Sequence, residues 1–527
     1  MAEQKTMNRG LVVVGAILIQ LCLGAIYAWS VFTPALTASD PADVASIYTA
    51  SKLDMDEARF DVMKDALLVP KDAMKAASKA AAAAAKEHGE DSAQHKAAKA
   101  AADAAKKASL ASMDAITAGF GVKDKVDALE YGMSKTQTQA VFAAGLAAFA
   151  VIMVLAGRIM PKVGPQKLAF AGGLVLGAGY LLAGLITPGS FTTTFVFVGL
   201  VGGSGIGLAY VVPIAVGMKW FPDKKGMITG LAVAGFGFGA LLWVKLGGRI
   251  GSLTMLIGHL GLGTTFVVYG IAFFALCVVG GLWMKNPPEG WAPVGWEAPK
   301  AAAAGAKPVA GTIDYTSGQM LKTPQFYMVF FCFMVGAGAG LMSIGLMKLF
   351  PGQALEAAGY SAAEASAIAG TAMAVFFSLA NGIGRIAWGT MSDKLGRKAS
   401  ILAMLATQGV FVILFQWMAG TPALLYVFAA LIGFNFGGNF ALFPTITADT
   451  FGTRYIGQNY GWVFLSYGVG GIFGPMLGGA LGDLGNFPLA FSICGVLVLV
   501  AAVVIALVKH PSHVAPAVAV EAEGEQK

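Results

Sequence analysis

The stretch NGIGRIAWGTMSDKLGRK, residues 381–398, passes from an apolar run into a short basic turn flanked by glycines. The segment GRIMPKVG at 157–164 follows another apolar run and repeats the turn, with the shared pattern G-x-x-x-[PD]-K-[VL]-G. An internal repeat of this kind indicates a chain built from two similar halves. Glycines beside both turns allow neighbouring helices to approach closely.

Around these turns, apolar runs long enough to cross a membrane occur twelve times. A helix needs about 20 apolar residues for one crossing. The runs lie at about 11–36, 136–156, 168–187, 192–217, 227–247 and 263–284 in the first half, and at 326–350, 365–388, 400–419, 422–447, 460–482 and 487–508 in the second. We therefore predict an all-α membrane protein with twelve transmembrane helices, six in each half.

The composition agrees with a membrane protein. Of the 527 residues, 57% are apolar and 12% are charged, whereas soluble domains are about 25% charged. Charge is concentrated in 38–131, where 29 of 94 residues are Asp, Glu, Lys or Arg, against 36 of the other 433. These values exclude a soluble domain, a disordered chain and a disulfide-rich secreted module. The net charge of +7 is typical of basic loops rather than of nucleic-acid binding.

The polar segments divide the chain. We predict a first transmembrane helix with a short N-terminal tail (1–37), an extracytoplasmic Ala/Lys-rich insert (38–131), the rest of the N-terminal bundle (132–284), a cytoplasmic linker (285–325), a C-terminal six-helix bundle (326–508) and a cytoplasmic tail (509–527). The insert favours helix because Ala, Lys and Glu are strong helix formers. It has few large apolar residues for packing, so we expect a hairpin over the outer mouth, either as a solvated decoration or with a docking or sensing role.

Basic residues set the orientation. With both termini in the cytoplasm, nearly all loop Lys and Arg outside the insert fall on the inner side, as expected for a plasma (inner) membrane protein. The four Cys lie in apolar runs and none of the five His is mid-span. We therefore expect no disulfide, no metal and no cofactor. No Ser/His/Asp set or pair of mid-span acids is present, so we do not expect an enzyme.

Arg385 is the most informative single residue. It lies within an apolar run, about three residues before the expected end of that run at Trp388. A charge at depth costs several kcal/mol unless it is paired or faces water, and a guanidinium suits a carboxylate through two parallel hydrogen bonds. Every acid outside the insert is placed in a loop, a tail or a span end. A cation without a built-in partner favours an anionic ligand, although an arginine that snorkels to the lipid headgroups is the alternative.

Longer sequence motifs resemble those of a known protein family. Four further motifs accompany the stretch at 381–398, namely GAIYAWSVF at 24–32, KWFPDKKGMITGLAVAGFGFGA at 219–240, NFGGNFALFPTITADTFGT at 435–453 and NYGWVFLSYGVGGIFGP at 459–475. Together these segments resemble the major facilitator superfamily and, within it, the oxalate/formate antiporter family, which is akin to monocarboxylate transporters. The resemblance implies two six-helix bundles around a central cavity and transport by alternating access.

The resemblance also implies the site. Arg385 matches the substrate-binding arginine, and the matching polar or aromatic lining positions are Tyr27, Gln139 and Tyr210. An aromatic cage falls on Phe436, Phe440 and Phe464, for which interhelical packing is the alternative. The oxalate transporter has a lysine where this chain has Tyr467, and eukaryotic monocarboxylate transporters have an aspartate where it has Asn381. The cytoplasmic turns supply gating residues: Gly157, Arg158, Lys162, Gly164, Gly389, Asp393, Gly396, Arg397 and Lys398.

These features predict a secondary active transporter of small monocarboxylates such as lactate, pyruvate or formate, working by anion exchange or linked to protons. One cation beside a phenol suits one carboxylate, whereas two cations suit a dicarboxylate. The alternatives are an oxalate/formate-type dicarboxylate exchanger and a carboxylate-sensing membrane receptor. We expect the partners to be the substrate and the lipid bilayer, with no nucleic acid, and a monomeric state.

Overall fold

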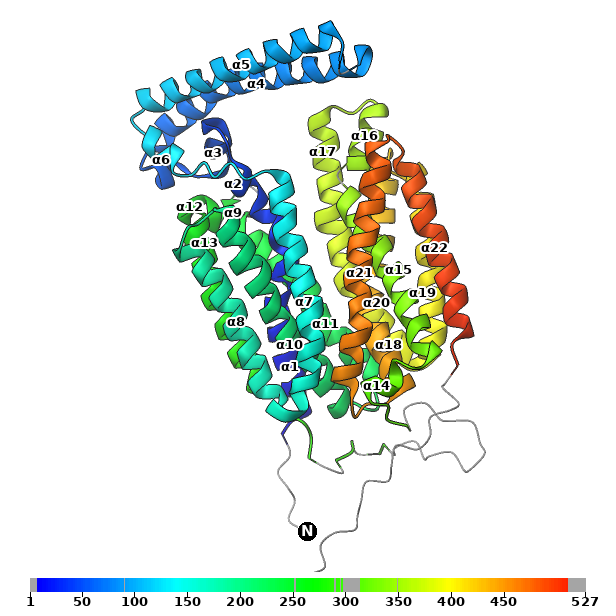
Figure 1. Ribbon diagram of the computed structural model, residues 1–527. Coiled ribbons are helices and arrows are strands. Elements are labelled where there is room, and N and C mark those ends of the chain that lie inside the picture. Colours follow the sequence, from blue (N-terminus) through cyan, green and yellow to red (C-terminus); the bar gives the residue numbers. More distant parts are fainter. Residues whose placement is uncertain are drawn as a thin grey trace, which may run out of the picture.

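The computed structural model describes residues 7–89, 91–250, 253–288, 291–293, 295–296, 313–347 and 349–509. Within these ranges, twelve helices are long and apolar enough to span a membrane. They form two bundles of six that lie side by side (Figure 1). The predicted all-α fold with twelve transmembrane helices in two bundles is therefore confirmed. Much of the predicted linker and nearly all of the predicted tail, at 289–290, 294, 297–312 and 510–527, lie outside the described residues.

The N-terminal bundle contains six spans. They are α1 (Arg9–Leu23) continued by η1 (Gly24–Val31) and α2 (Thr33–Thr37), α7 (Lys135–Val163), α8 (Pro165–Leu185), α9 (Phe191–Thr193) with η3 (Thr194–Gly202) and α10 (Gly203–Trp220), α11 (Lys225–Gly247), and α13 (Leu262–Gly281). A two-residue ladder, β1 (Arg249–Ile250) with β2 (Leu253–Thr254), and α12 (Leu256–Leu260) connect the last two spans.

The C-terminal bundle repeats the arrangement. Its spans are α15 (Pro324–Leu346), α17 (Ala362–Thr371) with η4 (Ala372–Phe377) and α18 (Ser378–Leu395), α19 (Arg397–Met418), α20 (Pro422–Phe451), α21 (Ile456–Asp483) and α22 (Phe487–Leu507). Short helices α14 (Ser317–Met320) and α16 (Leu349–Ala357) precede and follow the first of these.

The two repeated turns end their helices in the same way. Gly164 ends α7 with φ 90°, and Gly396 ends α18 with φ 86°. This backbone conformation is open to glycine and strained for other residues. Because α18 continues to Leu395, just before Gly396, it runs seven residues beyond Trp388, the predicted end of the eighth span. The polar residues after Trp388 extend the helix beyond the apolar run instead of breaking it.

The insert is a helical hairpin joined to the N-terminal bundle. Helices α4 (Glu57–His88) and α5 (Ala93–Gly119) lie antiparallel and extend across one end of the molecule toward α17 (Figure 1). We call this end the hairpin face and the other end the opposite face. At the base of the hairpin lie α3 (Pro41–Ile47), η2 (Ala50–Leu53) and α6 (Lys123–Asp127).

The base of the hairpin is packed more firmly than its composition suggested. Phe60, Met63 and Leu67 of α4 and Met113 of α5 are all buried there. Large apolar residues are few in the insert, but they are gathered at this one place. Lys71 of α4 also forms ion pairs with two aspartates near the start of α3. The distal half of the hairpin consists mainly of exposed Ala, Lys and acidic residues.

Candidate substrate-binding site

Arg385 lies deep between the bundles. It is ten residues before the end of α18 at Leu395, or about 15 Å along the helix at 1.5 Å per residue. Its side chain is 0% exposed. The predicted end of the eighth helix at Trp388 is therefore wrong, because α18 continues to Leu395. A fully buried guanidinium does not snorkel to the lipid headgroups.

The guanidinium contacts both bundles. Its Nε donates a hydrogen bond to Asn381 Oδ1 at 3.2 Å, one turn earlier on α18, and its Nη1 donates to the carbonyl oxygen of Val233 on α11 at 2.9 Å. Glycine makes this approach possible, since a Cβ at Gly230 would overlap with the carbonyl of Arg385. The cation is thus held at the seam where α11 and α18 meet.

Aromatic rings cover the cation. The Cζ atom of Arg385 lies 4.2 Å from the ring centre of Phe440 and 5.6 Å from that of Phe236. A cation over a ring face is stabilised by about 0.5–2 kcal/mol, with the larger values in dry sites. These rings supply part of the compensation that a buried charge needs, and they form an apolar wall beside it.

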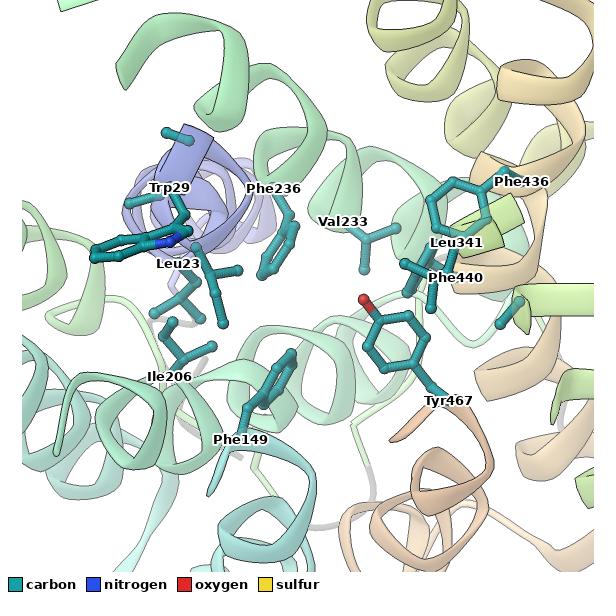
Figure 2. Packing of buried hydrophobic residues seen from close by; sticks show 14 of the residues in the cluster. Leu23, Trp29, Phe149, Ile206, Val233, Phe236, Leu341, Phe436, Phe440 and Tyr467 are labelled. Atoms are coloured by element: carbon teal, nitrogen blue, oxygen red, sulfur yellow. The ribbon is translucent and has the colours of Figure 1, made fainter. Parts of the chain in front are cut away.

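A box of aromatic side chains continues from this wall. The ring of Tyr210 lies 5.0 Å from Phe149, 5.5 Å from Phe236 and 5.2 Å from Phe464, and Phe464 lies 5.0 Å from Tyr467. The first three rings come from the N-terminal bundle and the last two from the C-terminal bundle. Figure 2 shows Phe149, Phe236 and Tyr467 pointing toward one another between the bundles. The box therefore spans the interface that alternating access would open and close.

One polar contact also crosses the box. The hydroxyls of Tyr27 in η1 and Tyr467 in α21 form a short hydrogen bond. The ring of Tyr27 packs edge-on against Phe236, with the centres 5.1 Å apart. This pair links the two bundles beside the rings that cover Arg385.

One polar atom at the box, Nη2 of Arg385, is buried without a hydrogen-bond partner among the described residues. The hydroxyls of Tyr210 and Tyr460 face each other. A buried polar group without a hydrogen bond costs about 1–3 kcal/mol. Such groups are expected where a ligand with oxygen atoms supplies the missing partners.

Two residues predicted from the sequence lie away from this centre. Gln139 is exposed on α7, ten residues from Phe149 toward the hairpin face, which is about 15 Å along the helix. Phe436 is buried behind Phe440, with the ring centres 5.3 Å apart, and it packs against Gly340. The structure brings the other seven together: Arg385, Asn381, Tyr27, Tyr210, Phe440, Phe464 and Tyr467.

Sequence reasoning missed Phe149, Phe236 and Tyr460. Phe149 and Phe236 stand in Ala- and Gly-rich helical stretches, where a single large ring is easily taken for packing or lipid contact. Tyr460 lies only four residues into α21, a place typical of a residue at the membrane surface. A tyrosine repeated at the seven-residue spacing of Tyr460 and Tyr467 was the available signal, because that spacing places both on one helix face.

Carboxylates are absent from the described surroundings of Arg385. Its hydrogen bonds and ring contacts in the described chain involve Asn381, Val233, Phe236 and Phe440. The acids of the transmembrane helices are found near their ends, as in Asp393 on α18 and Asp449 on α20. The centre of the molecule is therefore cationic.

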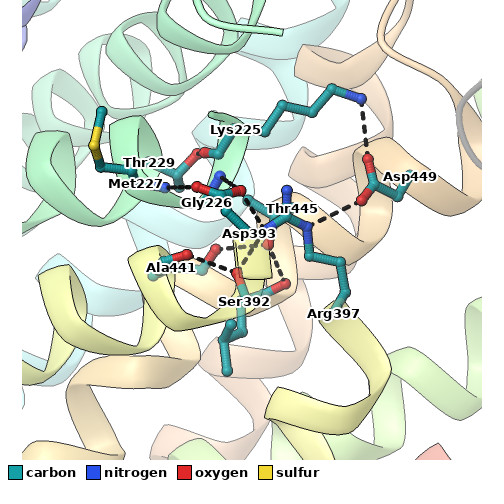
Figure 3. A network of polar contacts seen from close by, with 12 residues as sticks. Lys225, Gly226, Met227, Thr229, Ser392, Asp393, Arg397, Ala441, Thr445 and Asp449 are labelled. Atoms are coloured by element: carbon teal, nitrogen blue, oxygen red, sulfur yellow. Dashed lines mark hydrogen bonds and ion pairs between the residues drawn. The ribbon is translucent and has the colours of Figure 1, made fainter. Parts of the chain in front are cut away.

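The second copy of the basic turn joins the bundles at the opposite face (Figure 3). The carboxylate of Asp393 accepts hydrogen bonds from the backbone N–H of Gly226 at 2.9 Å and of Met227 at 2.7 Å, at the start of α11. A carboxylate is favourable at a helix N-terminus because the first N–H groups lack helical partners. Asp393 also pairs with Arg397 at 2.7 Å.

A second carboxylate completes this network. Asp449 of α20 pairs with Lys225 of the N-terminal bundle and with Arg397 of the C-terminal bundle, both at 3.0 Å. We call Asp393, Arg397, Asp449 and Lys225 the latch. It is a bridge of ion pairs between the bundles, and Asp393 lies about two helical turns after Arg385 on α18.

In the described part of the chain, the first copy of the turn joins the bundles without ion pairs. A Cβ at Gly157 would overlap with the carbonyl of Gly457 on α21, so α7 and α21 are in close contact there. Arg158 lies over the ring of Trp462, with Cζ 5.2 Å from the ring centre. Lys162 and Lys398, at the ends of the two turns, are exposed.

Comparison with known proteins agrees with this architecture. The family model described as the Major Facilitator Superfamily matches residues 108–376 and 349–526. The oxalate:formate antiporter of Oxalobacter formigenes is 28% identical over 349 residues, 66% of this chain and 76% of that protein. Apicoplast pyruvate carrier 1 of Toxoplasma gondii is 25% identical over 369 residues, 62% of this chain and 66% of that protein.

A solved structure shows the same fold. The human organic anion transporter MFSD10 superposes with a TM-score of 0.55 at 12% identity, covering 95% of this chain and 100% of that one. The chain belongs to the Major Facilitator Superfamily. It is a multi-pass membrane transporter and, like its relatives, not an enzyme.

Proposed function

We propose that this transporter carries small monocarboxylates, such as lactate, pyruvate or formate, by alternating access. The observation that carries the proposal is Arg385, a fully buried cation at the bundle interface that has an unpaired Nη2 and, among the described residues, no carboxylate partner. A substrate carboxylate would accept from this guanidinium, and the rings of Phe236 and Phe440 would contact the carbon part. The antiporter of Oxalobacter formigenes and the pyruvate carrier of Toxoplasma gondii are named for substrates of this class.

The number of cations supports one carboxylate rather than two. Position 467 holds a tyrosine whose hydroxyl is already bonded to Tyr27, so Arg385 is the single cation among the described residues of the box. A dicarboxylate would bury a second negative charge without a cation, at a cost of several kcal/mol. Tighter binding of oxalate than of lactate would contradict this choice and favour the dicarboxylate exchanger.

Proton coupling through a carboxylate beside Arg385 is disfavoured. The residue one turn before the arginine is Asn381, which accepts a hydrogen bond but does not titrate. Exchange of one anion for another, or entry of a proton together with the substrate, requires no such carboxylate. We therefore propose anion exchange as the main mode.

We also propose that the opposite face is cytoplasmic in the inner membrane. The latch, the two basic turns and the first described residues of α1 are all at that face. Clusters of Lys and Arg mark cytoplasmic loops, so the hairpin would lie outside the cell. The site is formed by one chain, which supports a monomer.

Transport assays with reconstituted vesicles test the proposal. We expect labelled pyruvate or lactate to exchange in counterflow and Arg385→Lys to weaken uptake at least about 30-fold, or about 2 kcal/mol, because an ammonium cannot reproduce the fork of a guanidinium. Arg59→Lys, on the exposed hairpin, is the matched control and should retain full activity. Saturable binding without flux would support the receptor alternative, and full activity of Arg385→Lys would refute the proposed role of the arginine.

A further inference from the structure

A hydrogen bond between two phenols joins the bundles on the hairpin side of the box. Tyr27 belongs to η1, which continues α1 toward the hairpin face, and Tyr467 follows Phe464 toward the same face on α21. In the described chain, the other hydrogen bonds and ion pairs between the bundles are made by Arg385 or by the latch. We call Tyr27 and Tyr467 the phenol pair.

Two aromatic rings connect the phenol pair to the guanidinium. The ring centre of Phe236 lies 5.6 Å from Cζ of Arg385 and 5.1 Å from the ring centre of Tyr27. The ring centre of Phe440 lies 4.2 Å from the same Cζ and 5.3 Å from the ring centre of Tyr467. Each phenol is thus separated from Arg385 by a single aromatic side chain, so an anion bound to Arg385 lies close to the pair.

Both helices are easily deformed next to the phenol pair. Tyr27 is the fourth residue of η1, an eight-residue 3₁₀ segment within the first span. A 3₁₀ stretch inside a helix often marks a hinge, because its hydrogen-bond geometry is poorer. After Tyr467, α21 continues with GVGGIFGP at 468–475, in which glycines and a proline weaken the helix. The hairpin-side parts of both spans can therefore bend at the pair while the box stays in place.

The phenol pair retains one hydrogen for a ligand. Two phenols carry two O–H hydrogens, and the bond between them uses one of these. Among the described residues, neither hydroxyl has another hydrogen-bond partner, and Nη2 of Arg385 is also unpaired. A small anion at Arg385 therefore meets two unused donors, one from the guanidinium and one from the phenol pair.

We propose that the phenol pair is a gate on the hairpin side that the substrate closes. The phenol that accepts within the pair donates its own hydrogen to the carboxylate on Arg385, and hydrogen bonds in such a chain strengthen one another. A bound substrate holds the hairpin-side parts of η1 and α21 together, whereas the empty carrier has only a bond between two neutral phenols. The role of the substrate rests on the proposed binding of a carboxylate at Arg385, but the bond between the bundles does not.

Distances between spin labels test the gate without substrate. Labels on Ile186→Cys and Leu484→Cys, exposed positions just after α8 and α21, report whether the hairpin face is closed, and the four native cysteines are buried. Tyr467→Phe should lower the closed-to-open ratio of the empty carrier about fivefold, as expected for one neutral hydrogen bond. Tyr27→Phe should have the same effect, and the double variant should add nothing, because either change removes the same bond.

The same labels test the effect of the substrate. Saturating pyruvate should raise the closed-to-open ratio at least about tenfold in the labelled parent and less than about threefold in Tyr467→Phe. Calorimetric titration should show that Tyr467→Phe still binds pyruvate, since Arg385 is intact. Tyr180→Phe is the matched control, because it removes a buried phenol of α8 that packs against Phe273 at 5.0 Å, outside the box. It should respond like the parent.

The outcomes separate the gate from the transport function. An unchanged ratio in the empty Tyr467→Phe carrier, or additive effects of the two substitutions, overturns the gate. A full pyruvate response in Tyr467→Phe overturns the role of the substrate in closing it. If the native protein neither binds nor exchanges pyruvate, the proposed function and the substrate's role both fail, while the ratio of the empty carrier still decides whether the phenol pair holds the bundles together.

Discussion

Removal of the charge at Asp393 should favour opening of the bundles at the opposite face. Asp393→Asn keeps the shape of the side chain but weakens two hydrogen bonds to the start of α11, at 2.9 and 2.7 Å, and the pair with Arg397 at 2.7 Å. A hydrogen bond to a charged group contributes about 1.5–3 kcal/mol. The amide retains part of each bond and Asp393 is not fully buried, so we expect a loss of about 2–3 kcal/mol. The closed-to-open ratio then falls about 30- to 150-fold.

Cysteine alkylation measures this shift. Thr229 lies on α11 inside the interface and is 1% exposed, so Thr229→Cys should react with a polar maleimide only when the opposite face opens. The four native cysteines are buried, and the protein without the added cysteine gives the background. We expect alkylation at least tenfold faster with Asp393→Asn.

A matched control isolates the role of the latch. Asp223→Asn breaks an ion pair of similar type, Arg9 with Asp223 at 3.3 Å, but both residues belong to the N-terminal bundle. It should leave the alkylation rate unchanged. If Asp393→Asn also leaves the rate unchanged, or if the control raises it equally, the ion pairs between the bundles do not hold this face closed.

Two further predictions concern packing and pH. Gly157→Leu should prevent α7 from docking on α21, because even a Cβ there overlaps with Gly457, and the same alkylation assay should show an open face; normal closure would contradict the close contact. Burial and then the charge of Asp127 raise the pKa of Glu130, at the base of the hairpin, to about 7 from a usual 4.5. The folded hairpin therefore keeps the proton on Glu130 between these two pH values, and its stability falls as pH rises through about 7. Glu130→Gln should remove the pH dependence of proteolysis of the hairpin between pH 5 and 8. If the pH dependence is retained, it belongs to another titratable group.

Sequence reasoning predicted the fold well because membrane spans and paired turns are local signals. Twelve apolar runs and the repeated glycine turn required no knowledge of packing. The place of Arg385 within its helix was different, because the apolar run ends at Trp388 while the helix continues to Leu395. Hydropathy reports where side chains stop being apolar, whereas hydrogen bonding and Gly396 decide where the helix ends.

Site residues could be predicted from the sequence only where a charged or polar side chain lies within an apolar run. An arginine in an apolar run is conspicuous, and so is a hydroxyl in the middle of a span. Phe149 and Phe236 are ordinary residues for a membrane helix, and only the three-dimensional arrangement shows that their rings meet Tyr210, and that Phe149 and Tyr210 meet Phe464 across the interface. The contact of Asp393 with α11 also required the structure, because it joins segments far apart in the chain.

The buried cation gives a physical reason for exchange. Whenever both faces are shut, an empty carrier must hold Arg385 without an anion, and Asn381, Val233 and the ring of Phe440 compensate only with partial charges. A bound carboxylate neutralises the guanidinium, so the loaded carrier passes through the closed state at a lower free energy. A difference of about 3 kcal/mol corresponds to a rate ratio of about 150. We therefore expect labelled pyruvate to leave vesicles about a hundredfold faster when unlabelled pyruvate is present outside, and equal rates in both cases would show that the empty carrier reorients as easily as the loaded one.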